Sequence, residues 1–378
     1  MERDQATTFI TDLLKLMIGR GGSDLFLTAE LPPTIKVDGK VTRVSSQALN
    51  GTHTIALARS IMNDRQVAEF ERTKECNFAI APPNLGRFRV NAFMQQGKVG
   101  MVLRTIPTKL PNIDELKLPP ILKDIVNTKR GLCILVGATG SGKTTTLAAM
   151  VDHRNESTYG HIITVEDPIE FVHAHKNCVV TQREVGIDTD SWGIALKNTL
   201  RQAPDVILMG EIRDRETMEL AIAFAETGHL CLATLHANST NQAIDRVINF
   251  FPEERRAQVL MDMSLNLKAM VSQRLIAKPD TKGRVAVVEI MINSPLISDL
   301  IFKGEVAEIK EVMKKSTNIG MQTFDQALFR AYEDDAITYE DALRNADSVN
   351  DLRLQIKLNS KRGVRKDLAA GTENLTYV

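Results

Sequence analysis

Gly137-Ala138-Thr139-Gly140-Ser141-Gly142-Lys143-Thr144 is the stretch of sequence that decides the fold. An unbroken apolar segment at 132–136 precedes it, and residues 145–151, which can continue as a helix, follow it. Strand, glycine-rich loop and helix is the context in which this spacing forms a phosphate-binding P-loop. Backbone N–H groups and the helix N-terminus then face the phosphates. A chance glycine-rich loop is the alternative, but the complete match in this context favours nucleoside triphosphate binding.

We expect the nucleotide to be held by this loop and the first turn of its helix. The predicted contact residues are Gly137, Ala138, Thr139, Gly140, Ser141, Gly142, Lys143, Thr144 and Thr145. Lys143 supplies positive charge for the β- and γ-phosphates, and the Thr144 hydroxyl is a ligand for Mg²⁺. The predicted cofactors are therefore ATP and Mg²⁺.

The composition is that of an ordinary globular protein with no overall electrostatic bias. Lys+Arg and Asp+Glu both number 47, so no net charge draws the chain to nucleic acid or to an anionic membrane. Its four cysteines are scattered, which indicates a reducing compartment and no structural zinc site. No apolar run approaches the roughly 20 residues of a membrane span. The N-terminus lacks the apolar core of a signal peptide, so we expect a cytoplasmic protein with no direct membrane span.

The chain divides into two predicted domains. Residues 1–105 mix helical spacing with short strands, including a hairpin around Asp38-Gly39, and read as a small α+β domain. Prolines at 107, 111, 119 and 120 predict a linker over 106–120, because proline fits poorly into either regular element. Residues 121–356 form the second predicted domain. Residues 357–378 carry a run of basic residues without periodicity and read as a flexible basic tail, although an anionic partner could bind there.

Strands and helices alternate in the second domain. Predicted strands lie at 132–136, 161–165, 205–209 and 230–235, with helices at about 192–200 and 216–226. This pattern is typical of a doubly wound, RecA-like α/β domain. Beyond residue 240 we expect a largely helical part with one late strand at 285–292. The methionines at 261, 263 and 270 read as core filler.

Two acids follow consecutive strands of the predicted sheet. Glu211 comes directly after the third strand, where ligands bind in α/β proteins, and could hold the metal. Glu166 ends the second strand at the same edge and is the preferred general base, with Asp167 and Glu170 as alternatives. A single acid in such a place is usually a helix cap or a solvated side chain. Two of them after a P-loop favour phosphoryl-transfer chemistry.

Two histidines flank the fourth strand, and three arginines lie on strands of the first domain. His229 and His236 could sense the γ-phosphate or reach a neighbouring subunit, but lone histidines are often structural. His173 and His175 read as a surface turn. No arginine follows the P-loop closely enough to act in cis on the transition state. The arginines at 87, 89 and 104 could act in trans within a ring, although alternating basic residues are usually the wet face of a strand.

With these features assembled, the sequence resembles the secretion ATPases of the type II/type IV pilus class, and the PilT/PilU family of twitching-motility ATPases from end to end. Four segments carry the resemblance: GATGSGKT at 137–144, ITVEDPIEF at 163–171, APDVILMGEIRD at 203–214 and AETGHLCLATLHANS at 225–239. In the family these are the Walker A motif, Asp box, Walker B motif and His box. GRFRVNAF at 86–93 and LRTIP at 103–107 match segments whose arginines reach the neighbour's nucleotide.

The resemblance implies roles for matched residues. It makes Glu166 the catalytic acid/base, Glu211 the Walker B acid and metal site, and His229 and His236 His-box residues. It places Arg87, Arg89 and Arg104 at a neighbour's nucleotide. The implied fold is an N-terminal PAS-like domain joined to a RecA-like ATPase domain, assembled as a homo-hexamer.

Within the family the chain is most similar to PilU-type members. The segment PLISDLIF at 295–302 stands where PilT-type members carry AIRNLIRE, and NDLRLQIKL at 350–358 is PilU-like. The resemblance implies an accessory retraction motor that works with a PilT-type ATPase at the inner-membrane platform protein. Alternatives are a pilus-extension or type II secretion ATPase, an ATP-binding scaffold for the PilT ring, and a RecA-like nucleic-acid translocase. The neutral charge and the lack of an aromatic-basic groove speak against the translocase.

Overall fold

A computed structural model describes residues 2–107, 110–279 and 283–362 of the 378-residue chain. Its contacts divide the chain into two compact units. The first comprises residues 1–109 together with Ile169–Val172, and the second comprises 110–168 and 173–378. The short segment Ile169–Val172 thus belongs to the first unit although the residues before and after it in sequence belong to the second.

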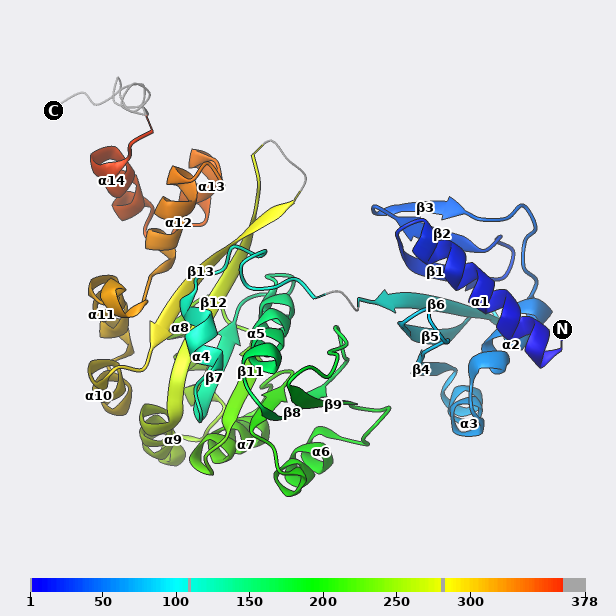
Figure 1. Cartoon of the computed structure of the whole chain (residues 1–378), viewed down its shortest axis with the longest axis horizontal. Helices are drawn as coiled ribbons and strands as arrows, with labels where there is room; N and C mark the ends of the chain where they lie inside the picture. The colour runs from blue at the N-terminus through cyan, green and yellow to red at the C-terminus, as the bar shows by residue number, and fades with distance from the viewer. Residues whose placement is uncertain (1, 108–109, 280–282, 363–378) are drawn as a thin grey trace. The chain divides into compact units, whose positions relative to one another are not determined.

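The first unit is a six-stranded antiparallel sheet in the order β3-β2-β1-β6-β5-β4, with helices packed against it (Figure 1). Its elements are α1 (Arg3–Gly19), β1 (Gly22–Thr28), β2 (Thr34–Val37), β3 (Lys40–Arg43), α2 (Gly51–Ile61), α3 (Asp64–Thr73), β4 (Glu75–Ile80), β5 (Arg87–Gln95) and β6 (Lys98–Ile106). Alternation along β5 sends Phe88, Val90 and Ala92 into the core, so Arg87 and Arg89 lie on the opposite face.

The second unit is built on a seven-stranded sheet in the order β13-β12-β7-β11-β10-β8-β9, parallel except for β12 with β13. Its first half contains α4 (Ile121–Val126), β7 (Gly131–Val136), α5 (Lys143–Ser157), β8 (Gly160–Glu166), β9 (Cys178–Glu184), α6 (Trp192–Thr199), η1 (Leu200–Gln202), β10 (Val206–Met209), α7 (Arg215–Glu226) and β11 (Leu230–Leu235). Its second half contains α8 (Thr240–Asn249), α9 (Glu253–Asn266), β12 (Leu267–Ala277), β13 (Arg284–Ile292), α10 (Pro295–Lys303), η2 (Val306–Glu308), α11 (Ile309–Lys315), η3 (Thr317–Ile319), α12 (Phe324–Glu333), α13 (Tyr339–Arg344) and α14 (Val349–Asn359).

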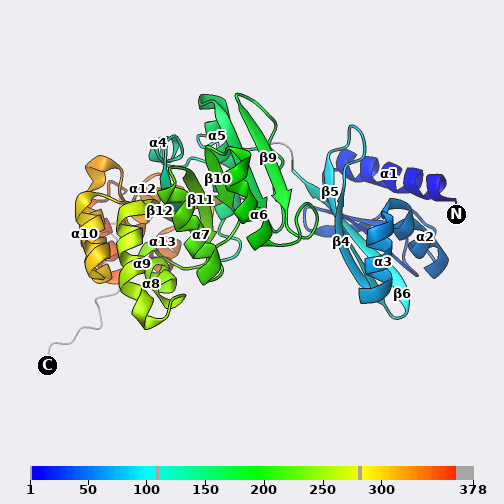
Figure 2. The ribbon, with the colours of Figure 1, turned by 90° about the horizontal axis from the view of Figure 1, so that it is seen from below.

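The central strand β7 is buried along its whole length because helices cover both faces of the sheet. Leu132, Ile134 and Val136 pack into one core with α7, α8 and α9, whereas Cys133 and Leu135 pack into the other with α4 and α5. Figure 2 shows these two groups of helices on opposite sides of the sheet. An apolar strand without alternation is what this arrangement requires, and residues 132–136 meet it.

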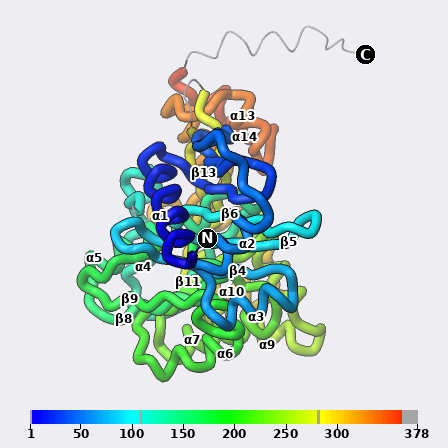
Figure 3. Tube along the Cα trace, turned by 90° about the vertical axis from the view of Figure 1, so that its right-hand side faces the viewer, coloured from blue at the N-terminus to red at the C-terminus, as the bar shows by residue number. Residues whose placement is uncertain are grey.

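The C-terminal helices have a small core of their own. Phe324, Leu328, Leu352 and Ile356 pack around Ile276 of β12, and α13 and α14 lie next to each other (Figure 3). Helix α14 continues to Asn359, and the Arg362 guanidinium lies 4.5 Å from the Tyr332 ring, so the ordered chain extends past the predicted start of the tail at 357. The rest of the predicted basic tail, 363–378, lies outside the described residues.

Two strands of this unit were not predicted. The part beyond residue 240 is largely helical and its late strand is β13, as predicted, but β12 precedes that strand and pairs with β7 and β13, which extends the sheet. Strand β9 was not predicted and forms the opposite edge. The mixed α/β class is confirmed by the structure, whereas the PAS-like identity of the first unit and the domain boundaries at 105, 120 and 356 stay predictions.

Candidate active site

The predicted P-loop connects β7 to α5. Val136 ends the strand, and α5 begins at Lys143 with Gly142 before it at a φ of 87°. Only glycine adopts that backbone without strain, and a Cβ there would lie 2.7 Å from the Gln273 amide nitrogen. The same crowding holds at Gly137, where a Cβ would meet the Gln273 carbonyl oxygen at 2.7 Å. These two glycines therefore let the loop lie close against β12.

The Lys143 ammonium lies on the inner side of the loop. Its Nζ donates to the carbonyl oxygens of Gly137 at 2.7 Å and Ala138 at 3.0 Å, and the residue is 7% exposed. Burial lowers the pKa of Lys143, and the nearby Glu211 carboxylate acts in the opposite direction. A cation held at this place is positioned to meet phosphates bound by the loop.

Gln273 of β12 ties the loop to the helix, and it was not predicted. Its amide nitrogen donates to the Ser141 carbonyl at 2.8 Å, and its amide oxygen accepts from the Thr146 hydroxyl at 2.7 Å. The Ser141 hydroxyl is buried without a hydrogen-bond partner in the described part of the chain. An unsatisfied buried donor beside a cavity of about 280 Å³ fits a site that binds a polar ligand. No sequence pattern around residue 273 signals this role, because the residue is more than 100 positions away from its partners Ser141 and Thr146.

Glu211 lies just past β10 and contacts the histidine that follows β11. Its carboxylate is 3.2 Å from His236 Nε2 and accepts from Arg213 Nε at 2.8 Å. The two strand ends are joined by the Ile212 N–H, which donates to the Thr234 carbonyl at 2.8 Å. Parallel strands thus bring an acid and a histidine, predicted separately, to one point.

Glu166 ends β8, the other neighbour of β10. It is 8% exposed and accepts hydrogen bonds from the Thr164 hydroxyl at 2.7 Å and the Gln182 amide at 3.2 Å. The Gly210 N–H donates to the Val165 carbonyl at 2.8 Å, so the chain leaves β8 and β10 side by side. The two predicted acids lie at the carboxyl ends of paired strands, at the edge where β7 carries the P-loop.

His229 does not join this group. It precedes β11, its carbonyl accepts from the Gly131 N–H at the start of β7, and its ring lies 3.1 Å from the Thr227 hydroxyl. Six residues of β11 separate it from His236, about 20 Å at the rise of a strand. His229 therefore cannot contact a nucleotide on its own chain's P-loop. Of the two roles predicted for it, only contact with a neighbouring subunit stays a prediction.

The three predicted arginines share one face of two paired strands in the first unit. Arg89 and Arg104 are cross-strand partners on β5 and β6, and Arg87 is two residues from Arg89. Arg104 Nε donates to Asp24 at 2.7 Å, and Arg89 lies 3.5 Å from Glu170. Burial raises the pKa of Asp24, but hydrogen bonds from the Ser23 hydroxyl and Arg104 outweigh it and lower that pKa overall.

A surface turn was predicted at His173, and for this residue the prediction was wrong. It is 8% exposed, and burial lowers its pKa to about 4. The neighbouring Asp152 carboxylate opposes this shift. The residue is therefore neutral near pH 7 and is buried.

These features define a P-loop nucleoside triphosphatase: a parallel sheet, a glycine loop with its lysine after the central strand, and two acids at the ends of neighbouring strands. No helix in the described ranges is long and apolar enough to cross a membrane.

Comparisons with known proteins specify the class. The model of the type II/IV secretion system protein family matches residues 3–344. The type IV pilus ATPase PilU of Pseudomonas aeruginosa is 60% identical over 92% of this chain and 91% of that protein, and PilT of the same organism is 46% identical over 89% and 98%. A crystal structure of the pilus retraction motor PilT with bound ADP matches with a TM-score of 0.85 at 38% identity, covering 91% of this chain and 98% of that one.

The chain therefore belongs to the type II/IV secretion system protein family and is a nucleotide-binding ATPase of the PilT/PilU kind. Its identity to PilU exceeds its identity to PilT of the same organism, which confirms the predicted family and branch.

Proposed function

We propose that this protein is a hexameric ATP-hydrolysing motor of the type IV pilus machine that assists pilus retraction and works as an accessory to a PilT-type ATPase. The observation that supports this proposal is the contact between Glu211 and His236 beside the end of β8, in a chain 60% identical to PilU. The proposal includes a PAS-like fold for the first domain and a RecA-like fold for the second.

Each residue of the site has a role in hydrolysis. Lys143 and the loop N–H groups hold the phosphates, and Glu166 accepts a proton from the attacking water. Glu211 and the Thr144 hydroxyl would hold Mg²⁺, since their oxygen atoms suit that ion and it needs only one or two protein ligands beside the phosphates. When bound, Mg²⁺ neutralises charge that develops on the phosphates. His236 orients the Glu211 carboxylate, which it contacts at 3.2 Å.

The proposed ring would bring arginines of one subunit to the nucleotide of its neighbour. Arg87, Arg89 and Arg104 lie on an exposed or half-buried face of the first unit, and a neighbour's nucleotide would place negative charge there. The ring would act in the cytoplasm, at the inner-membrane platform protein of the pilus.

A second candidate is an ATP-binding scaffold for the PilT ring. The segment 295–302, which forms most of α10, differs from the AIRNLIRE sequence of PilT-type members, and this favours a chain that does not retract pili alone.

The test is the MgATP turnover of the purified protein across concentrations that span assembly, followed by light scattering, with and without a PilT-type ATPase. A motor gives a specific rate that rises as hexamers form. A scaffold forms rings without turnover and raises the rate of the added PilT-type ATPase instead. A protein that stays monomeric at every concentration contradicts both.

A further inference from the structure

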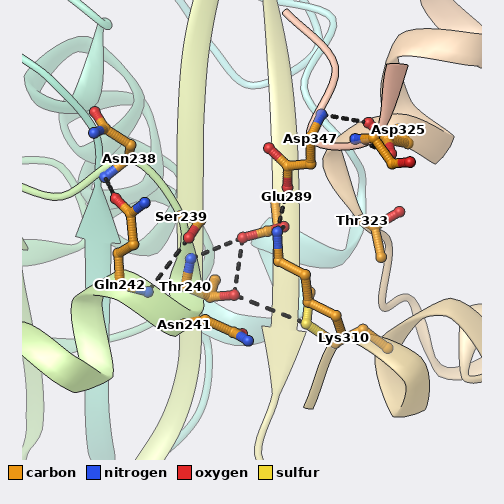
Figure 4. Close-up of polar contacts among 12 residues, drawn as sticks. Asn238, Ser239, Thr240, Asn241, Gln242, Glu289, Lys310, Thr323, Asp325 and Asp347 are labelled. Carbon is orange, nitrogen blue, oxygen red and sulfur yellow. Dashed lines mark hydrogen bonds and ion pairs between the residues drawn. The ribbon is translucent and has the colours of Figure 1, made fainter. Parts of the chain in front are cut away.

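The segment after His236 is held by the C-terminal part of the chain. The Asn238 carbonyl accepts from the Arg274 guanidinium at 3.1 Å, and the Thr240 N–H and hydroxyl both donate to Glu289 at 2.8 Å. Figure 4 shows Glu289 between this segment and Lys310. Asn238 and Arg274 also line the cavity beside the P-loop. The part of the cavity wall at Asn238 is thus anchored by Arg274 and Glu289, which lie outside the motifs of the family.

Arg274 is the centre of this anchor. Besides Asn238 it contacts the Asn345 carbonyl and donates to Asp347 at 2.9 Å, and its guanidinium lies 3.9 Å from the centre of the Phe324 ring. The side chain is about one-quarter exposed. A planar group with donors on several edges and an aromatic ring below it is fixed in orientation, which a lysine cannot reproduce.

Asp347 connects Arg274 to a second cation. Its other carboxylate oxygen pairs with Lys310, whose Nζ lies 3.8 Å from the fully buried Glu289. The Asp347 N–H donates to Asp325 at 2.8 Å, which fixes the loop between α13 and α14 (Figure 4). The contacts run from Asn238 through Arg274, Asp347, Lys310 and Glu289 back to Thr240. Such a network orders its members more than an exposed pair does.

We propose that Arg274 and Asp347 are positioning residues for ATP hydrolysis: they hold Asn238, two residues after His236, against the nucleotide cavity. This inference rests on the proposed hydrolysis at this site. Neither residue belongs to the Walker, Asp-box or His-box segments. Displacing the 236–240 segment moves the histidine that orients Glu211, so loss of the anchor changes turnover and nucleotide affinity without removing a reacting group.

The experiment compares Asp347→Asn, Arg274→Lys and Arg274→Ala with Asp299→Asn, which removes a carboxylate from an exposed pair with Lys303 on α10. For each protein we measure kcat and KM for ATP, affinity for ADP, and Tm. We expect kcat/KM to be about tenfold lower in the three anchor variants and unchanged in the control. A tenfold loss is the size expected when one strong interaction that stabilises the transition state is removed. Arg274→Lys should not rescue, and the double variant of Asp347→Asn with Arg274→Ala should lose no more than Arg274→Ala alone.

The proposal is overturned if Asp347→Asn and Arg274→Lys lower Tm but leave kcat, KM and ADP affinity as in the control, because the anchor is then structural only. A wild type without turnover contradicts the proposed function instead. In that case the affinity for ADP tests the positioning role of the anchor. Weaker ADP binding in the anchor variants than in Asp299→Asn supports positioning, and equal binding refutes it. If Arg274→Ala does not fold, the near-isosteric Asp347→Asn gives the answer.

Discussion

At the level of single residues, Arg104 has a structural partner within its own unit as well as a proposed role toward a neighbour. The two roles can be separated, because Arg104→Ala removes both, whereas Asp24→Asn leaves the arginine in place and removes the carboxylate charge that it faces at 2.7 Å. We expect Arg104→Ala to lower kcat by about 100-fold or more, as loss of one transition-state donor does, while ATP still binds. Asp24→Asn should retain turnover. Equal losses in the two variants would mean that Arg104 acts through the fold alone.

His173 makes the stability of the second unit depend on pH. Its pKa is lowered from 6.5 to about 4 by burial, so at pH values below 6.5 the unfolded chain takes up a proton that the folded chain does not. The contribution of His173 to stability should be constant above pH 7 and fall by about 2 to 3 kcal/mol as the pH drops from 6.5 to 4.

Urea unfolding of the wild type and His173→Asn over this range measures the effect, with His175→Asn at an exposed neighbouring position as control. His173→Asn should show a shallower loss of stability than both other proteins. Parallel curves for all three would contradict the assignment.

Much of the site at residue level could be predicted because its chemistry is local in sequence. The acids and His236 follow strands directly, so the parallel sheet brings them to one edge. Gln273 and Arg274 could not be found this way, since their roles depend on partners more than 30 residues distant. His173 was misread because burial of a histidine in a polar segment depends on tertiary packing.

At the level of elements, β12 is the strand that supports the P-loop. Gln273→Ala leaves the Thr146 hydroxyl and the Ser141 carbonyl without their partner, so we expect a loss of about 1 to 3 kcal/mol in unfolding free energy and weaker nucleotide binding. Unfolding in urea and an ADP titration measure the two effects. Gln258→Ala on α9, whose side-chain amide donates to Asp262 four residues away at 2.6 Å, is the matched control. A variant as stable as the control would show that β12 does not support the loop.

Strand β12 was missed for a physical reason. It begins at Leu267 immediately after α9 ends at Asn266, with no glycine or proline to separate them, and its leucine, lysine and methionine residues suit helices as well. Pairing with β7 and β13 decides its conformation, and this is a tertiary effect. Strand β7, apolar throughout and ended by glycine, carried its own signal.

At the level of the whole molecule, the proposal requires sites shared between subunits. Mixing Arg104→Ala with Glu166→Gln protein tests this, because a mixed ring contains some interfaces with both native residues. We expect each variant alone to be nearly inactive and the mixture to recover a measurable part of the wild-type rate. Mixed rings that remain inactive would contradict action in trans.

The organisation of the whole chain was partly predictable. The change from short strands to alternating strands and helices marked two regions, but the assignment of Ile169–Val172 to the first unit could not be read from it. That segment directly follows Glu166-Asp167-Pro168 and contains Glu170, the partner of Arg89. Only packing of residues distant in sequence places it there.

The most direct test of the account is the MgATP turnover of Glu166→Gln at saturating ATP, measured on assembled protein together with its ATP affinity. Glu166 lies buried at the end of β8 and is the proposed base, so the account predicts a kcat at least about 100-fold below wild type with ATP affinity retained. Lys143→Ala, measured in parallel, should lose affinity as well. A Glu166→Gln protein that hydrolyses ATP at the wild-type rate would contradict the proposed site.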